Sequence, residues 1–177
     1  MADQTIRLYT AEQVRGLDKC AIEGHGIPGM TLMEKAGQST FAAARAAYPS
    51  TRKYLVLCGG GNNGGDGYIV ARLALEAGLQ VTVCALKEPA QLTGDALTAA
   101  DRWQKAGGVV RAWPLDESFD FDLVVDAMLG TGLAREPAGA YGVAVEVISR
   151  SGKPVIAVDI PCGRHADTGG ERGRGVG

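Results

Sequence analysis

Short apolar runs alternate with amphipathic segments along most of the chain. Five of the runs are dominated by residues typical of buried strands: 53–58, 80–86, 109–113, 121–129 and 154–160. The segments between them include three with the apolar spacing of helices: 66–77, 91–106 and 139–150. Buried strands separated by helices predict an α/β protein, a three-layer αβα sandwich around a Rossmann-like, mostly parallel sheet.

Two extra N-terminal helices are predicted ahead of this sheet. Thr10 and Gln13 have the spacing of a capping box, which indicates a helix over 11–23. Pro28 suits the first position of a second, amphipathic helix that reaches about residue 47. At the other end, five of the nine residues 169–177 are glycine, as in a flexible tail. Residues 1–168 are therefore expected to form one domain.

The composition is that of a single globular domain. Of the 177 residues, 46% are hydrophobic, and 18 Lys and Arg balance 20 Asp and Glu. This balance predicts no nucleic-acid partner, and no apolar run approaches the roughly 18 residues of a membrane span. The four cysteines lack metal-type spacing, and the N-terminus lacks a secretory signal pattern. We therefore expect a cytoplasmic protein with reduced cysteines.

Polar groups lie at the carboxyl ends of four of the five predicted strands: a glycine-rich loop at 59–67, Lys87, Asp126 and Asp159. The carboxyl ends of parallel strands meet at one edge of the sheet, which is where ligands bind in open α/β folds. We therefore expect these groups to converge on one ligand site.

The loop at 59–67 fits the pattern G-x-G-x-x-G between a strand and a helix, where a dinucleotide diphosphate commonly binds. A plain tight turn would need glycines as well. Two features argue against an ordinary dehydrogenase. Lys87 stands near the end of the second strand, where an acidic residue should hold the ribose, and Asn62 and Asn63 add amide side chains to the loop. We interpret the loop as part of the reaction pocket itself.

Asp126 and Asp159 each end a predicted buried strand. Taken singly, either carboxylate could simply cap the next turn. Together, and beside Asn63, they form a set of oxygen groups that could bind a cation or place a general base. Lys87 allows two interpretations, a solvated surface residue or a catalytic one. The backbone N–H groups of 130–132 are expected to be free for phosphate.

Four segments resemble one family in order along the chain: GIPGMTLMEKAG (26–37), GGGNNGGDGYIVARL (59–73), VVDAMLGTGL (124–133) and VDIPCGRHADTG (158–169). The family is that of the NAD(P)H-hydrate epimerases, also called the YjeF N-terminal domain or apolipoprotein A-I-binding protein family. The resemblance implies an isomerase that interconverts the R and S epimers of NADHX and NADPHX, nicotinamide nucleotides hydrated at C6. A dehydratase that accepts the S epimer is the implied partner, and a homodimer is the implied assembly.

The resemblance also implies roles for individual residues, by position. Catalysis is expected of Lys87, Asp126 and Asp159. A potassium ion is the implied cofactor, with ligands at the positions of Asn63, Asp126 and Cys162. Substrate contacts are expected from two loops and one strand end: Asn62, Asn63, Gly64, Gly65, Asp66, Gly130, Thr131, Gly132, Leu133, Ala134, Arg135, Glu136 and Asp159.

The chain departs from the family at three points. Cys162 stands where the family normally has Ser, and Arg164 and His165 replace a usually apolar neighbour. The family also continues with a further strand and helix, so we expect a C-terminally shortened domain or the N-terminal part of a bifunctional epimerase–dehydratase. Two other interpretations stay open: a non-catalytic dimerising scaffold of the kind found in RNA decay, and an NAD-dependent oxidoreductase. Retention of Lys87 and the two aspartates favours the enzyme over the scaffold.

Overall fold

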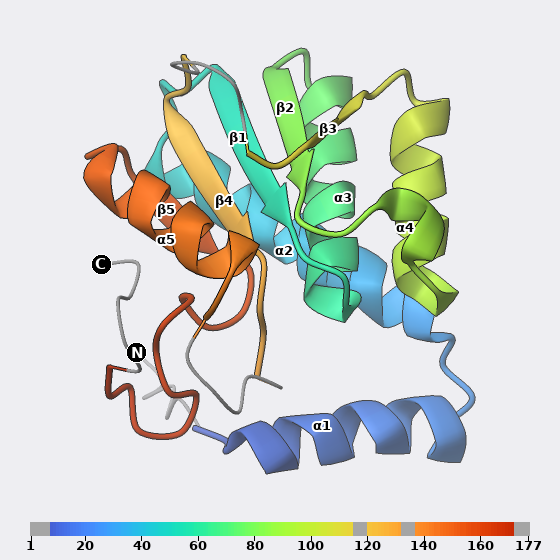
Figure 1. The fold of residues 1–177 in the computed structure, drawn as a ribbon. Coiled ribbons are helices and arrows are strands. Elements are labelled where there is room, and N and C mark those ends of the chain that lie inside the picture. Colours follow the sequence, from blue (N-terminus) through green and yellow to red (C-terminus); the bar gives the residue numbers. More distant parts are fainter. Residues whose placement is uncertain (1–7, 115–119, 132–136, 172–177) are drawn as a thin grey trace, which may run out of the picture.

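A computed structural model describes residues 8–114, 120–131 and 137–171, and a parallel sheet forms its centre (Figure 1). Its strands are β1 (Lys53–Cys58), β2 (Gln80–Ala85), β3 (Val110–Ala112), β4 (Leu123–Ala127) and β5 (Val155–Ala157). All pairings among them are parallel, in the order β3-β2-β1-β4-β5. The predicted parallel sheet is thus confirmed, and the strand order reverses between β1 and β4, where open α/β sheets bind ligands.

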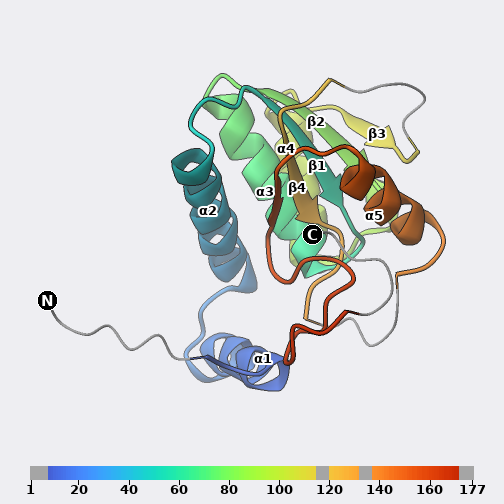
Figure 2. The same cartoon turned by 90° about the vertical axis from the view of Figure 1, so that its left-hand side faces the viewer.

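Helices cover both faces of the sheet (Figures 1 and 2). On one face lie α2 (Gly29–Ala47), α3 (Asn62–Glu76) and α4 (Gly94–Lys105), while α5 (Ala140–Arg150) lies on the other. Side chains of β1 alternate between the two cores, with Val56 packed towards α3 and Leu57 packed towards α5. This arrangement confirms the three-layer sandwich. A short 3₁₀ turn, η2 (Pro89–Gln91), follows β2.

The first helix, α1 (Ala11–Lys19), lies apart from the three layers, beyond the carboxyl edge of the sheet (Figures 1 and 2). The Thr10–Gln13 capping box is present, and the predicted helix over 11–23 continues after Lys19 as a π-helical turn, η1 (Cys20–Gly24). Among the described residues, two long-range side-chain hydrogen bonds attach α1 to the body of the protein. The Ala11 N–H donates to Asp167 Oδ1 at 2.7 Å, and Arg15 Nη1 donates to the Thr131 carbonyl at 3.1 Å.

Several predicted boundaries were wrong, chiefly at the carboxyl edge. β4 ends at Ala127 and β5 at Ala157, earlier than the predicted 129 and 160, because the following residues leave the ladder to line a cavity. The helix predicted from 66 begins at Asn62, so the glycine-rich loop is shorter than expected. The tail predicted from 169 is tied back at its start, where the His165 N–H donates to the Gly170 carbonyl at 2.8 Å. Residues 172–177 lie outside the described residues.

No helix in the described part of the chain is long and apolar enough to cross a membrane.

Candidate active site

The glycines after β1 allow a close approach of three backbone segments. A Cβ on Gly59 would lie 1.9 Å from the Met128 carbonyl oxygen, and one on Gly64 would lie 2.1 Å from the carbonyl oxygen of Gly59. A Cβ on Gly67 would lie 2.4 Å from the Ala127 Cβ. Only glycine permits contacts this short. The loop therefore packs the start of α3 against the ends of β1 and β4, and its glycines are needed for that packing.

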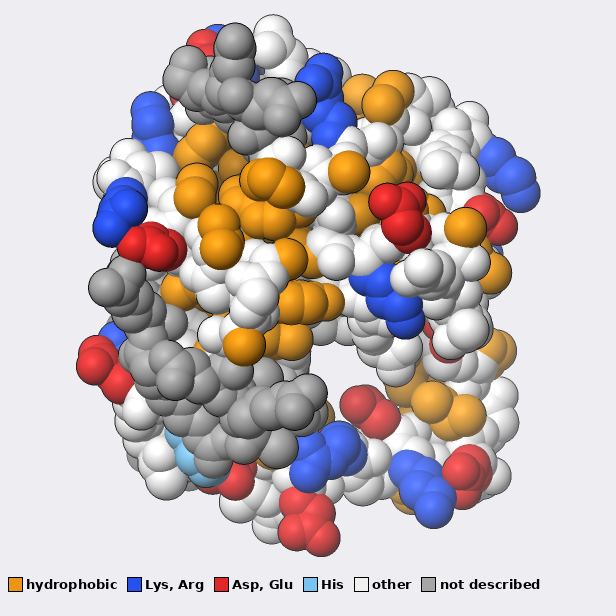
Figure 3. Space-filling model, viewed as in Figure 1, with side chains coloured by type: hydrophobic (Ala, Val, Ile, Leu, Met, Phe, Trp, Pro, Cys, Tyr) orange, Lys and Arg blue, Asp and Glu red, His pale blue; other side chains and the backbone are white. Residues whose placement is uncertain are grey.

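A cavity of about 1080 Å³, here called the main cavity, opens at this edge of the sheet. Figure 3, viewed as in Figure 1, shows this hollow between the body of the protein and α1. Its walls come from five places in the chain: α1 (14, 15, 18), the glycine loop and start of α3 (60–63, 66), Lys87, the loop after β4 (128–131) and the end of β5 (158, 159), with single residues from α2 and α5. The polar groups predicted after β1, β2 and β5 thus meet in one cavity.

Asp159 is held at the cavity wall by the loop after β4. Its Oδ2 accepts the Thr131 N–H at 2.7 Å, while the residue stays exposed. A Cβ on Gly130 would lie 2.7 Å from the same oxygen, so glycine there leaves room for the carboxylate. The hydrogen bond corrects one expectation. The Thr131 N–H is already used by Asp159 and is not free for phosphate.

Lys87 reaches the cavity across the glycine loop. A Cβ on Gly60 would lie 2.4 Å from Lys87 Cδ, so the side-chain stem runs over the bare backbone of Gly60. The residue is exposed and lines the main cavity. Lys87 is therefore an exposed lysine that lies in the cavity wall, and its catalytic role stays a prediction.

Asn63 has one satisfied and one unsatisfied end. Its Nδ2 donates to the Leu129 carbonyl at 3.0 Å, which fixes the side chain against the loop after β4. Its Oδ1 is buried and has no hydrogen-bond partner among the described residues. A buried carbonyl oxygen without a donor costs free energy unless a ligand or ion satisfies it. This oxygen is therefore a candidate cation ligand.

Asp126 does not join the other predicted catalytic residues. It is fully buried, and its Oδ2 accepts the Cys162 N–H at 2.9 Å. Its Oδ1 accepts the Met128 N–H at 3.2 Å and the Cys162 thiol at 3.1 Å. Burial raises the pKa of Asp126, and the hydrogen bonds from Cys162 and Met128 oppose that rise. The carboxylate ties two loops together behind the cavity wall and does not line the cavity.

Cys162 is the partner of Asp126 in this buried pair. Burial, and then the charge of Asp126, raise the pKa of the Cys162 thiol well above its ordinary value. The thiol therefore keeps its proton and donates a hydrogen bond to the carboxylate. In this geometry the sulfur is hydrogen-bonded to Asp126. The Cys in place of the family's usual Ser therefore changes the donor of a buried hydrogen bond.

Asp66 lies in the first half of α3 and is half-buried in the cavity wall. Burial, followed by the charges of Asp159 and Asp18, raises the pKa of Asp66 to about 7. The sequence predicted a substrate contact here and gave no sign of this shift. Asp66 is thus able to hold or release a proton near neutral pH.

Some predicted substrate contacts lie elsewhere. Gly64 and Gly65 are buried in packing, Gly65 against Met33 and Ala96, and neither lines the main cavity. Gly132 to Glu136 lie outside the described residues. The prediction missed Val14, Arg15 and Asp18, which line the cavity from α1. Their spacing of three and four residues places them on one face of the predicted helix, which was the available signal.

Within the described residues, no three His, Cys, Asp or Glu side chains form a metal-binding group. A potassium site would instead use neutral oxygens such as Asn63 Oδ1. The remaining acceptor capacity of Asp126 Oδ2 could add a carboxylate oxygen to such a site.

Comparisons with known proteins find relatives that match most of this chain. The bifunctional NAD(P)H-hydrate repair enzyme Nnr of Escherichia coli is 40% identical over 94% of this chain, which spans 32% of that protein. The NAD(P)H-hydrate epimerase of Rhodobacter capsulatus is 39% identical over 90% of this chain and 78% of its own length. The chain thus spans about a third of the bifunctional relative and most of the epimerase.

A solved structure agrees with the fold. The crystal structure of the yeast protein ynu0 superposes with a TM-score of 0.86, over 97% of this chain and 77% of the yeast chain, at 22% identity. A family model described as "YjeF-related protein N-terminus" matches residues 29–176. The chain belongs to the YjeF-related N-terminal domain family.

Proposed function

We propose that this chain is an isomerase that interconverts the R and S epimers of hydrated NADH and NADPH. The observation that carries the proposal is the main cavity, where Lys87, Asp66 and Asp159 converge beside the unsatisfied oxygen of Asn63. The names of the relatives supply the substrate class, since proteins similar over nearly all of this chain are called NAD(P)H-hydrate epimerase or repair enzyme.

The chemistry of the hydrate suits these residue types. C6 of the ring carries a hydroxyl group and is bonded to N1. A base removes the hydroxyl proton, the C6=O bond forms and the C6–N1 bond breaks, while an acid protonates N1. Rotation of the resulting aldehyde and reclosure of the ring invert C6. Reversible loss of water through an iminium ion is the other route, and it also needs a base and an acid. Each correctly placed group contributes about 10²- to 10⁴-fold to the rate.

The structure favours particular residues for these steps. Asp159 is the proposed base, because it is the strand-end aspartate that is exposed in the cavity. Lys87 is the proposed proton donor or charge stabiliser. Asp66, with its pKa raised to about 7, is positioned to exchange protons with the same site. Asp126 is proposed to position the loops after β4 and β5.

A potassium ion is proposed at Asn63 Oδ1, with Asp126 as a second ligand. The support is the buried, unsatisfied amide oxygen. The Cys162 thiol is engaged with Asp126, so a contribution from Cys162 would come from its backbone carbonyl. Such an ion would stabilise negative charge and fix the loops that line the cavity. If the ion binds there, potassium chloride should raise the melting temperature of the protein. Choline chloride at equal ionic strength is the control and should not raise it.

The reaction implies a partner. Epimerisation repairs nothing by itself, so we propose that a dehydratase consumes the S epimer, either as a fused domain or as a separate protein. The homodimer implied by the resemblance and the cytoplasmic location expected from the cysteines and the N-terminal sequence stay predictions.

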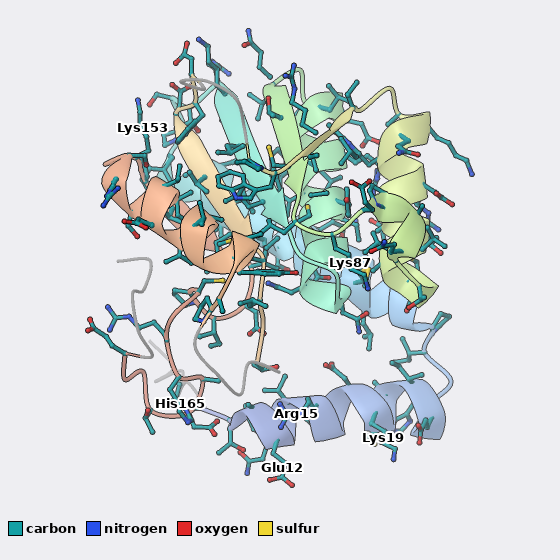
Figure 4. All side chains as sticks on the ribbon, viewed as in Figure 1. Glu12, Arg15, Lys19, Lys87, Lys153 and His165 are labelled. Atoms are coloured by element: carbon teal, nitrogen blue, oxygen red, sulfur yellow. The ribbon has the colours of Figure 1, made fainter. Side chains whose placement is uncertain are left out.

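Proton NMR of freshly prepared (R)-NADPHX in potassium buffer tests the proposal directly. The wild-type chain is expected to produce the S epimer much faster than buffer alone. Lys87→Ala should slow the conversion about 10²-fold. Lys153→Ala is the matched control, because Lys153 is exposed and far from the cavity (Figure 4). Conversion no faster than in buffer would refute the proposed function.

A further inference from the structure

The helix α1 contributes to the main cavity although it precedes residues 29–176, which the family model matches. Arg15 and Asp18 face the cavity from α1, while Lys87 lines its opposite, sheet side (Figure 4). Glu12 and Lys19 project from the other side of α1, away from the sheet (Figure 4). One face of α1 is therefore a wall of the site.

The charges of the cavity wall pose a problem for a dinucleotide. Asp18, Asp66 and Asp159 all line the cavity and repel a diphosphate. The backbone N–H of Thr131, which was expected to bind phosphate, is already donated to Asp159. The described cations of this wall are Lys87 and Arg15. If Lys87 serves the nicotinamide ring, the diphosphate needs the second cation.

We propose that Arg15 anchors the diphosphate of the dinucleotide substrate, an inference that rests on the proposed function. One of its five N–H groups donates to the Thr131 carbonyl at 3.1 Å, which fixes the guanidinium beside the loop after β4. The remaining edge of the planar guanidinium suits two oxygens of a phosphate. The N–H of the same residue, Thr131, donates to Asp159, so the backbone of one residue contacts both the proposed base and the anchor.

A purely structural role for Arg15 makes a different prediction. If Arg15 only tethers α1 through the Thr131 carbonyl, its removal should impair every substrate equally. If it binds the diphosphate, its removal should impair only substrates that carry one. A matched pair of substrates therefore separates the two roles: NADHX and the hydrate of dihydronicotinamide riboside, which has the same ring and no phosphate.

The kinetic test compares wild type, Arg15→Ala, Arg15→Lys and the control Lys19→Ala. Lys19 is on the same helix, is exposed and pairs with Glu23 at 3.8 Å. Arg15→Ala should raise KM for NADHX about 10- to 100-fold with kcat within about twofold, and Arg15→Lys should recover part of the loss. The riboside hydrate should react equally well with all four proteins. Equal losses on both substrates would overturn the inference.

A binding test does not depend on activity. ADP-ribose carries the diphosphate without the reactive ring, and its affinity can be measured by titration calorimetry. Arg15→Ala should weaken ADP-ribose binding at least about tenfold, and Lys19→Ala should leave it unchanged. If ADP-ribose binding depends on Arg15 but the protein does not epimerise the hydrate, the proposed function is refuted and this inference is supported. No ADP-ribose binding by wild type, or equal affinity in Arg15→Ala, would overturn this inference whether or not the chain epimerises.

Discussion

Two aspartates at neighbouring strand ends have opposite environments. Asp126 is the last but one residue of the interior strand β4 and is enclosed by Met128 and Cys162, whereas Asp159 follows the edge strand β5 and is exposed in the main cavity. β4 pairs with β1 and β5 on its two sides, so the end of β4 is covered from both directions. The environment of a carboxylate at a strand end therefore depends on whether its strand is an interior or an edge strand of the sheet.

Asp159→Asn gives the largest expected effect, because it removes the proposed base while keeping an oxygen that can accept the Thr131 N–H. We expect kcat to fall about 10²- to 10⁴-fold, with the melting temperature nearly unchanged. Epimerisation followed by proton NMR and thermal unfolding give the two readouts. A near-normal kcat would break the contrast between the two aspartates at once.

Asp126→Asn should act chiefly on stability. The amide would turn an N–H₂ group towards groups that donate hydrogen bonds, at a cost of about 1–3 kcal/mol in the free energy of unfolding. Urea denaturation measures this loss, with the exposed Asp101→Asn on α4 as the matched control. A protein as stable as wild type but inactive would instead assign Asp126 a direct role in the reaction.

The titration of Asp66 sharpens the comparison, since Asp159 raises the pKa of Asp66 and Asp126 is not among the causes of the shift. The pKa of Asp66, about 7 in wild type, should fall in Asp159→Asn and stay raised in Asp126→Asn. Carbon-detected NMR of the carboxyl group gives both values. An unchanged value in Asp159→Asn would mean that the two carboxylates do not interact.

The same shift has a consequence for stability. The folded protein keeps the Asp66 proton up to pH values where the unfolded chain has lost it. The contribution of Asp66 to the free energy of unfolding therefore falls as pH rises from about 4 to about 7. Asp66→Asn removes this penalty. It should stabilise the protein at pH 8 by about 1–2 kcal/mol, a discounted figure because solvent reaches the half-buried side chain, and the gain should vanish near pH 4. Denaturation curves at both pH values check this.

Cys162→Ser should have the smallest effect. The hydroxyl can donate to Asp126 as the thiol does, so we expect a change in unfolding free energy within about 1 kcal/mol and kcat within about twofold. Cys162→Ala, which has no donor, should destabilise more. If Cys162→Ser changed kcat tenfold, the side chain would have a role beyond its hydrogen bond to Asp126.

The layers of the fold and the residues at the strand ends could both be predicted from the sequence, because both depend on local patterns. Apolar runs such as 53–58 and the G-x-G-x-x-G loop are local patterns, and parallel pairing then brings the strand ends together. What the sequence could not show depends on distant contacts. The hydrogen bonds of Asp126 come from residues up to 36 positions away, and that of Arg15 goes to a residue 116 positions away. Neither distance leaves a periodic signal.

Both attachments of α1 reach forward in the chain, to Thr131 and to Asp167. During synthesis α1 emerges first, yet the residues that hold it emerge more than a hundred positions later. A nascent chain released before residue 167 would have its sheet strands in place but would lack the attachment of α1 to Asp167. Substrate capture is therefore expected to be among the last properties this domain acquires as it is made.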